Sequence, residues 1–208
     1  MLIGLAALAA VLLPFVWPIV QHLTVMAHEG VHAVAGSLLG FTLDGIRLNP
    51  VAAGETIGDF SPGPRGILVA FVGYLGPSAC GLGAAKLISK GYIVAVLWLA
   101  IILLALLLAM VRWSFGIITV PGAIALLVWL LAYKPTGTEI IASYALAWLL
   151  LLSGVRVAFT HGTEAWDAYY LRDTAFLPRS LWFVLWLGGA LWALAIGGSL
   201  LVYTAGTS

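Results

Sequence analysis

The sequence has little charge and almost no cysteine. Only 8% of its 208 residues are Asp, Glu, Lys or Arg, against about 25% in soluble domains. The net charge of +1 gives no basic field for nucleic acid. The single cysteine, Cys80, excludes an internal disulfide and any metal site built from several cysteines. Because 63% of the residues are hydrophobic and the mean hydropathy is +1.13, the composition predicts an integral membrane protein surrounded by lipid.

Proline, glycine and charged residues divide the chain into about seven apolar runs, each close to the roughly 20 residues that cross a bilayer. The predicted spans cover about 3–20, 21–40, 66–88, 92–111, 115–133, 139–158 and 180–204. Pro14 and Pro18 interrupt the first two, and because one straight helix over both would be about 60 Å long, a break or sharp kink is required there. We therefore expect an all-α polytopic membrane protein with a single domain over residues 1–208.

Two long connections join these spans. Residues 42–60 contain short β-like runs separated by Gly, Asn and Pro, which predicts a small β-ribbon; an irregular loop is the alternative. Residues 159–179 precede the last span and carry several aromatic side chains, which favours a re-entrant or membrane-surface segment. Six Arg fall on the side of these connections and three Lys on the other, so the positive-inside rule places both connections in the cytoplasm.

One short motif places ionisable side chains inside an apolar span. It reads His28-Glu29-Gly30-Val31-His32, an HExxH pattern. Residues i and i+4 share one face of a helix, so both imidazoles can bind one Zn²⁺ while the carboxylate reaches a water on the metal. The alternative is two packing histidines with a paired Glu, but ionisable groups are costly to bury in a membrane. The motif therefore predicts metal-assisted hydrolysis with Glu29 as the catalytic base.

Three islands of sequence resemble the M50 family of site-2 protease-like intramembrane metallopeptidases, and more closely its M50B-like branch. The first island is the HExxH motif, and the second is Gly73-Tyr-Leu-Gly-Pro77, which is similar to the family's Gly-Tyr-x-Gly-Pro. The third is Asp167-Ala-Tyr-Tyr-Leu171, followed by Thr174, Pro178, Trp182 and Trp186. The larger members' Asn-Pro-Asp-Gly or Leu-Asp-Gly element is absent, and there is no room for a PDZ domain.

A catalytic zinc needs a third protein ligand beside His28 and His32. The resemblance implies Asp167, while three other residues of the same connection, His161, Glu164 and Asp173, remain alternatives. His22 is interpreted as an interfacial or capping residue. Counting helical residues from the cytoplasmic ends puts His32 and Gly73 at a similar depth, about 12 Å. We therefore expect the second island to meet the metal site, and we assign substrate contact to its members Gly73, Tyr74, Gly76 and Pro77.

The resemblance implies a zinc-dependent endopeptidase that cleaves a transmembrane segment of another membrane protein, in a bacterial plasma membrane with the active site towards the cytoplasm. The ribbon at 42–60 would hold the unwound substrate by strand addition. The alternative is a membrane scaffold or chaperone-like protein that keeps the fold and cuts nothing. A transporter with a proton relay is less favoured, because the ionisable groups cluster at one depth. The sequence gives no oligomeric state.

The distribution of Lys and Arg makes a testable prediction about topology. In intact cells, a membrane-impermeant thiol reagent should label an introduced cysteine near residue 206 and should not label cysteines introduced near residues 55 or 163. The reverse labelling pattern would invert the orientation and turn the site outward.

Overall fold

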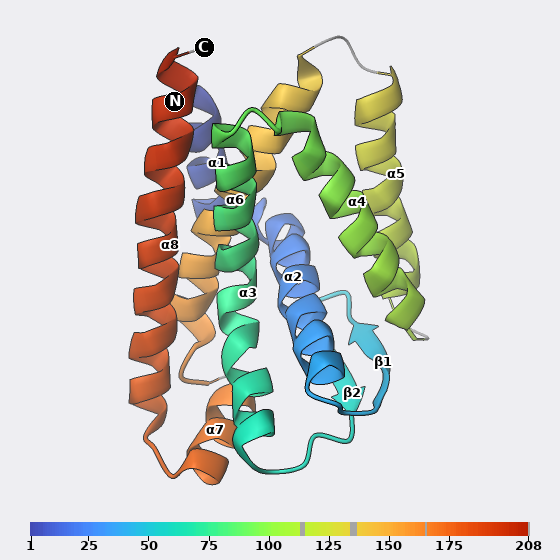
Figure 1. Ribbon diagram of the computed structural model, residues 1–208, viewed down its shortest axis with the longest axis vertical. Helices are drawn as coiled ribbons and strands as arrows, with labels where there is room; N and C mark the ends of the chain where they lie inside the picture. The colour runs from blue at the N-terminus through green and yellow to red at the C-terminus, as the bar shows by residue number, and fades with distance from the viewer. Residues whose placement is uncertain (113–114, 134–136, 165, 208) are drawn as a thin grey trace.

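Helices make up most of the computed structural model, which describes residues 1–112, 115–133, 137–164 and 166–207 (Figure 1). The elements in chain order are α1 (Leu2–Leu12), α2 (Trp17–Leu38), β1 (Leu43–Leu48), β2 (Gly54–Gly58), α3 (Pro64–Ser89), α4 (Ile93–Met110), α5 (Gly116–Tyr133), α6 (Thr138–His161), α7 (Trp166–Ala175) and α8 (Arg179–Thr207). The expected fold class, a helical membrane protein with a small ribbon after the HExxH helix, is confirmed.

The number of membrane spans is smaller than the expected seven. Among the described residues, five helices are long and apolar enough to cross a bilayer: α3, α4, α5, α6 and α8. The pair α1 and α2 passes the same test only together, with a bend of 97° between the two helices, which makes six spans if the pair counts as one. The 11 residues of α1 reach about 16 Å, roughly half the hydrocarbon thickness. Residues 1–40 therefore form one sharply bent unit instead of two complete spans.

The bend lies where the two prolines predict a break. Helix α1 ends at Leu12, and Pro18 lies in the first turn of α2, where a residue without an N–H is tolerated. Arg156 of α6 stabilises the junction: its guanidinium donates a hydrogen bond to the carbonyl of Val11 and lies 4.1 Å from the ring centroid of Trp17. A carbonyl released at the end of α1 thus finds a partner inside the bundle.

The predicted ribbon is confirmed as an antiparallel pair of strands. Leu43 lies opposite Gly58 and Leu48 opposite Gly54, with a register shift between Leu43 and Gly45. The outer edge of β1 is also paired, because the N–H of Arg112 donates to the carbonyl of Ile46 and the N–H of Phe115 donates to that of Leu48. Arg112 and Phe115, which lie between α4 and the first turn of α5, therefore bond to the outer edge of β1, and β1 has partners on both of its edges.

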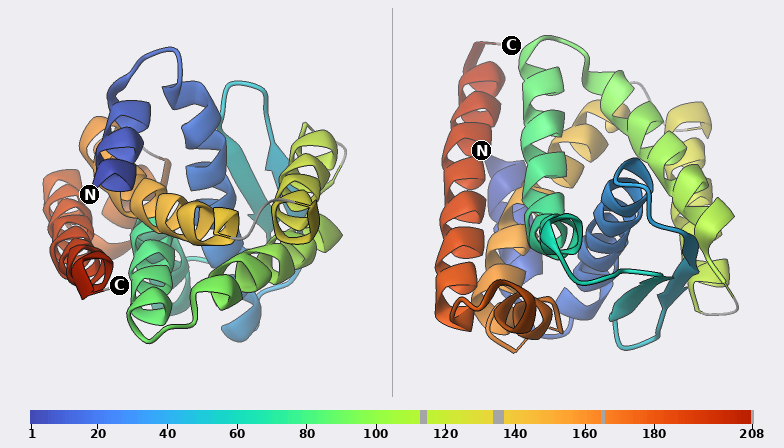
Figure 2. Two further views of the ribbon diagram at one scale, coloured as in Figure 1. Left: turned by 90° about the horizontal axis from the view of Figure 1, so that it is seen from above. Right: turned by 60° about the horizontal axis from the view of Figure 1, so that its bottom comes forward.

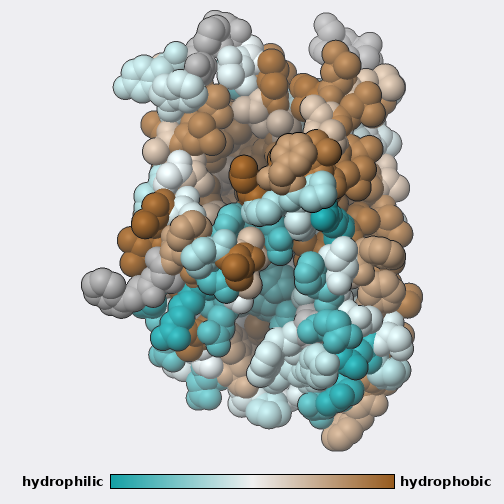
Figure 3. Space-filling view, turned by 180° about the vertical axis from the view of Figure 1, so that it is seen from behind, coloured by the Kyte–Doolittle hydropathy of each residue, from teal (hydrophilic) through white to brown (hydrophobic). Residues whose placement is uncertain are grey.

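Helix α3 lies at the centre, in contact with α2, α6 and α8 (Figures 1 and 2). The ribbon lies between α2 and the pair α4 and α5, where the fully buried Ile46 packs with Met26, Leu104 and Leu107. Helix α7 closes the end of the bundle from which the ribbon also projects (Figure 1). On the face seen in Figure 3, hydrophilic residues gather towards that same end, whereas hydrophobic residues cover most of the other.

The contact of α3 with α6 depends on a close approach at Gly81. A Cβ at this position would lie 2.8 Å from the backbone nitrogen of Leu151, and that atom cannot move without its helix. Gly83, two residues further along α3, has open space where its Cβ would be.

We therefore expect Gly81→Ala to lower the free energy of unfolding by about 1–3 kcal/mol through overpacking. Gly83→Ala is the matched control and should be neutral or slightly stabilising, because alanine is the better helix former. Thermal unfolding in detergent measures both. Equal midpoints of thermal unfolding for the two variants would show that the close contact of α3 with α6 at Gly81 does not contribute to stability.

Candidate metal centre

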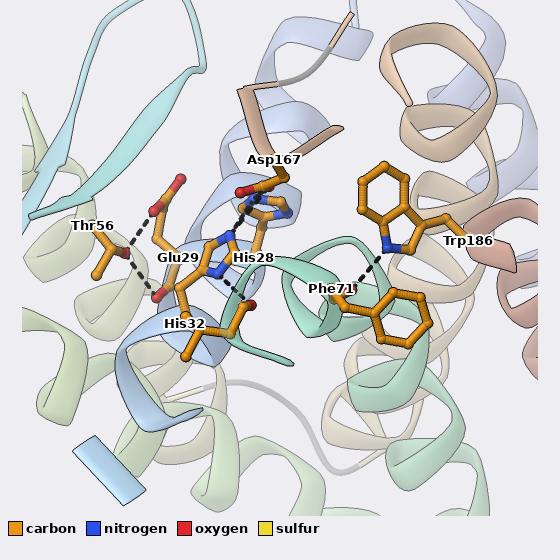
Figure 4. A network of polar contacts seen from close by, with 8 residues as sticks. His28, Glu29, His32, Thr56, Phe71, Asp167 and Trp186 are labelled. Carbon is orange, nitrogen blue, oxygen red and sulfur yellow. Dashed lines mark hydrogen bonds and ion pairs between the residues drawn. The ribbon is translucent and has the colours of Figure 1, made fainter. Parts of the chain in front are cut away.

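The polar residues of the HExxH motif lie on two faces of α2 (Figure 4). His28 and His32 point towards α3 and α7, whereas Glu29 points towards strand β2. Successive residues of a helix are about 100° apart, so this separation follows from the motif itself. His32 and Glu29 are buried, with 7% and 4% of their surface exposed. Each of these groups therefore needs a polar partner within the protein.

Asp167 completes a cluster with the two histidines. Its Oδ2 lies 3.3 Å from Nε2 of His28 and 3.4 Å from Nε2 of His32, and the two Nε2 atoms are 2.9 Å apart. Among the described residues, this is the group of His, Cys, Asp or Glu side chains placed to hold a metal ion. The sequence expectation that Asp167 converges with the two histidines is met.

Helix α7 brings Asp167 to the site by packing against the bundle. Ala168 and Leu171 are fully buried and contact the core formed with α3, α6 and α8. From the apolar side chains on both sides of Asp167, the sequence also predicts that Trp166 and Tyr169 are buried with Ala168 and Leu171. This prediction is wrong for the two aromatic residues, because Trp166 is 79% exposed and Tyr169 is 37% exposed. Only one side of a surface helix can face the bundle, and Ala168 and Leu171, three residues apart, occupy that side.

The charge on Asp167 is set by its neighbours. Burial alone would raise the pKa of this carboxyl, but hydrogen bonds to His28 and His32 outweigh the burial and hold the pKa well below its usual range. Asp167 is therefore ionised near neutral pH, which is the state that binds a metal.

The orientation of His32 is fixed by α3. Its Nδ1 lies 2.9 Å from the carbonyl oxygen of Val69. A carbonyl only accepts hydrogen bonds, so Nδ1 carries the proton and a neutral imidazole has its lone pair on Nε2, the atom that faces His28 and Asp167. A backbone or carboxylate partner on the other ring nitrogen is the usual arrangement for metal-binding histidines.

The residues of the second island line the wall behind the two histidines. The ring of Tyr74 meets His28 edge-on, with centroids 4.9 Å apart, and stacks on Trp186, whose indole N–H donates to the carbonyl of Phe71 (2.8 Å). Gly76 lies against Val31 and the carbonyl of Ala27 on α2. Pro77 lies inside α3 and has no N–H to donate to the carbonyl of Gly73. All four of the predicted substrate-contact residues are buried.

The space between these groups fits a metal ion. A Cβ on Gly73 would lie 2.3 Å from Nε2 of His32 and 3.0 Å from Cε1 of His28, so the space beside the histidines exists because residue 73 has no side chain. A tetrahedral zinc with bonds of about 2.0–2.1 Å separates its ligand atoms by about 3.3–3.4 Å. The two distances from Asp167 match this separation, and the distance between the imidazoles is slightly shorter. The two nitrogens and one oxygen are zinc's usual ligand atoms.

One partner of the motif was not identified from the sequence. The hydroxyl of Thr56, on β2, donates to Oε2 of Glu29 at 2.6 Å. A single threonine in a short strand gives no sequence signal for such a contact, because the pairing depends on how the ribbon docks on α2.

The alternative ligands lie elsewhere. His161, Glu164 and Asp173 are exposed and have other partners: His161 contacts Thr160, Glu164 contacts Tyr169, and Asp173 pairs with Arg172 at 2.7 Å. The ring of His22 contacts Phe115, away from the cluster, with centroids 5.4 Å apart.

Comparison with known proteins gives one match. The family model described as Peptidase M50B-like matches residues 1–197, which include the HExxH motif, the second island and Asp167. No curated protein and no solved structure matches the chain significantly.

The cluster predicts that Asp167→Ala weakens zinc binding far more than Asp173→Ala. Loss of one of three protein ligands should reduce the affinity at least 100-fold, by analogy with the roughly 10- to 100-fold cost of losing a group that only supports a ligand. Asp173 has a comparable carboxyl on the same helix but pairs with Arg172, so its removal should leave the affinity within about twofold. Competition with a chromogenic chelator measures both, and similar affinities would exclude Asp167 as a ligand.

Proposed function

The chain belongs to the Peptidase M50B-like family, and from this premise we propose that it is a zinc-dependent intramembrane endopeptidase that cleaves a transmembrane segment of another membrane protein. The observation that carries the proposal is the convergence of His28, His32 and Asp167, with Glu29 on the adjacent position of the same helix. We propose the whole chain, residues 1–208, as a single membrane metallopeptidase domain.

His28, His32 and Asp167 would hold the ion. A zinc ion at this site would supply Lewis acidity that lowers the pKa of a water and polarises the peptide carbonyl. Glu29 takes one proton from the attacking water as its oxygen forms a bond to the carbonyl carbon. The same carboxyl then delivers that proton to the leaving nitrogen as the C–N bond breaks. Glu29 thus acts first as base and then as acid, and its burial keeps competing bulk water away.

The substrate must present an extended backbone, because the carbonyls of a helix are bonded within the helix. Arg112 and Phe115 already bond to the outer edge of β1. Strand β2, which lies beside Glu29, has no backbone partner on its other edge among the described residues. We infer that an unwound substrate segment pairs with this edge of β2.

The buried residues of the second island support the site from behind. Gly73 leaves the space for the metal, and Tyr74 holds the ring of His28. We propose that the residues of the second island contact the substrate only as the inner wall of the site, beside which the scissile peptide bond would lie.

The site lies towards the end of the bundle that carries the ribbon and α7 (Figure 1). The first turn of α3 and helix α7, which carry Arg65 and Arg172, lie at this end, and the last turn of α3, which carries Lys86 and is followed by Lys90, lies at the other (Figure 1). Lys134 lies outside the described residues. We propose that this end faces the cytoplasm of a bacterial cell.

Glu29→Gln should abolish cleavage and keep the zinc, because the carboxylate acts on water and is not a metal ligand. His28→Ala and His32→Ala should lose both the metal and the activity. Metal analysis of each purified variant, together with cleavage of a membrane-protein substrate in liposomes, separates the two effects. Wild-type turnover in Glu29→Gln would contradict the mechanism. Full zinc occupancy without any zinc-dependent cleavage in the wild type would favour the scaffold alternative.

A further inference from the structure

Strand β2 is docked on the face of α2 that carries Glu29. Gln21, Val25 and Glu29, each four residues apart, form one stripe of the helix. The side chain of Gln21 donates to the carbonyl of Ala52 at 3.2 Å, in the turn that leads into β2. At Gly54, a Cβ would lie 2.8 Å from Cγ1 of Val25 and 2.6 Å from Cγ of Glu29. The ribbon is thus held along about two turns of α2, and one of its close contacts lies at the proposed base.

The hydroxyl of Thr56 is aimed at Glu29 by the strand. Thr56 lies opposite Ile46, whose side chain is fully buried, so this pair faces the interior of the protein. Oγ1 of Thr56 lies 2.6 Å from Oε2 of Glu29 and 3.2 Å from the backbone carbonyl oxygen of the same residue (Figure 4). A hydroxyl has one proton to donate, and the shorter distance is typical of a bond to a carboxylate.

The two oxygens of Glu29 therefore have different surroundings. Oε2 accepts from Thr56, whereas Oε1 faces Gly54, where a Cβ would approach to 2.8 Å. Because residue 54 has no side chain, the space beside Oε1 stays free. Thr56 therefore holds Oε2 in place, and Oε1 is the oxygen that remains to accept a proton.

From this geometry we propose that Thr56 is a positioning residue that fixes the carboxyl of Glu29 for proton transfer. The inference rests on the proposed peptidase function and adds a residue that neither the motif nor the family match indicates. It also joins two parts of the site: the strand with an open edge for substrate is the strand that orients the base. A substrate that pairs with β2 therefore stiffens the element on which Glu29 depends.

Thr56→Val keeps the shape of the side chain and removes the hydroxyl. We expect kcat to fall about 10- to 100-fold, as for other losses of oriented acid–base catalysis, with KM changed by less than about twofold and zinc content unchanged. Thr56→Ser keeps the hydroxyl and should restore kcat to within about threefold of wild type. The matched control is Thr119→Val on α5, whose hydroxyl donates to the carbonyl of Phe115 at 3.2 Å; its kinetics should equal those of the wild type.

Gly54→Ala tests the same arrangement from the other side. Its Cβ would take the space beside Oε1 and push β2 from α2, so kcat should again fall while the zinc is retained. Wild-type kcat in Thr56→Val, or failure of Thr56→Ser to restore kcat, would overturn the proposal, because the hydroxyl would then not matter.

A second measurement does not use catalysis. In metal-free protein, infrared difference spectra between wild type and Glu29→Gln identify the carboxylate band of Glu29. That band should shift in Thr56→Val and stay in place in Thr56→Ser and Thr119→Val. An unshifted band in Thr56→Val would overturn the inference. A wild type that binds zinc and cleaves nothing would contradict the peptidase function, and the infrared result would still decide whether Thr56 holds Glu29.

Discussion

The fold depends on one constraint: the polar side chains of one turn of α2, which lies inside an apolar bundle, need hydrogen-bonding partners within the protein. Two histidines and a glutamate on α2 cannot be left without partners in a membrane. The partners come from three elements that are far apart in the sequence: Asp167 on α7, the carbonyl of Val69 on α3, and Thr56 on β2. The ribbon and the short helix α7 therefore serve to bring Thr56 and Asp167 to α2. The lipid-facing helices α4 and α5 have no such constraint, and few of their residues are buried.

Small residues make this convergence possible. Gly73 allows α3 to approach the histidines, and Gly54 allows β2 to approach Glu29. In both places a single added carbon would fill the space in which the proposed chemistry takes place. Larger residues have the opposite role: Tyr74 and Trp186 stack behind His28, and the indole of Trp186 donates to α3. The close contact at Gly73 and the aromatic contacts of Tyr74 and Trp186 together restrict the histidine rings to the arrangement that a metal needs.

Much of this could be predicted from the sequence, and the rest fails for identifiable reasons. Hydropathy places the five long helices to within a few residues, because the bilayer sets their length. It does not show that the first 40 residues bend by 97°, since prolines mark a break and not its angle. The family motifs point to Asp167 but not to the exposure of Trp166, which depends on which side of α7 meets the bundle. Nothing in the sequence marks Thr56 as a partner of Glu29. The two residues are 27 positions apart, and they meet only because the ribbon docks on α2.

The HExxH spacing has a consequence beyond metal binding. Because His28 and Glu29 are neighbours on a helix, their side chains diverge by about 100°, and different elements must support them. Helices α3 and α7 contact the histidine face, and the ribbon contacts the glutamate face. The proposed metal side is thus built from helices that pack in the core, whereas the Glu29 side is built from a two-stranded ribbon that docks on α2. Under the proposed function, a substrate strand added to β2 would contact the element that holds Glu29, whereas the proposed metal ligands are held by α3 and α7.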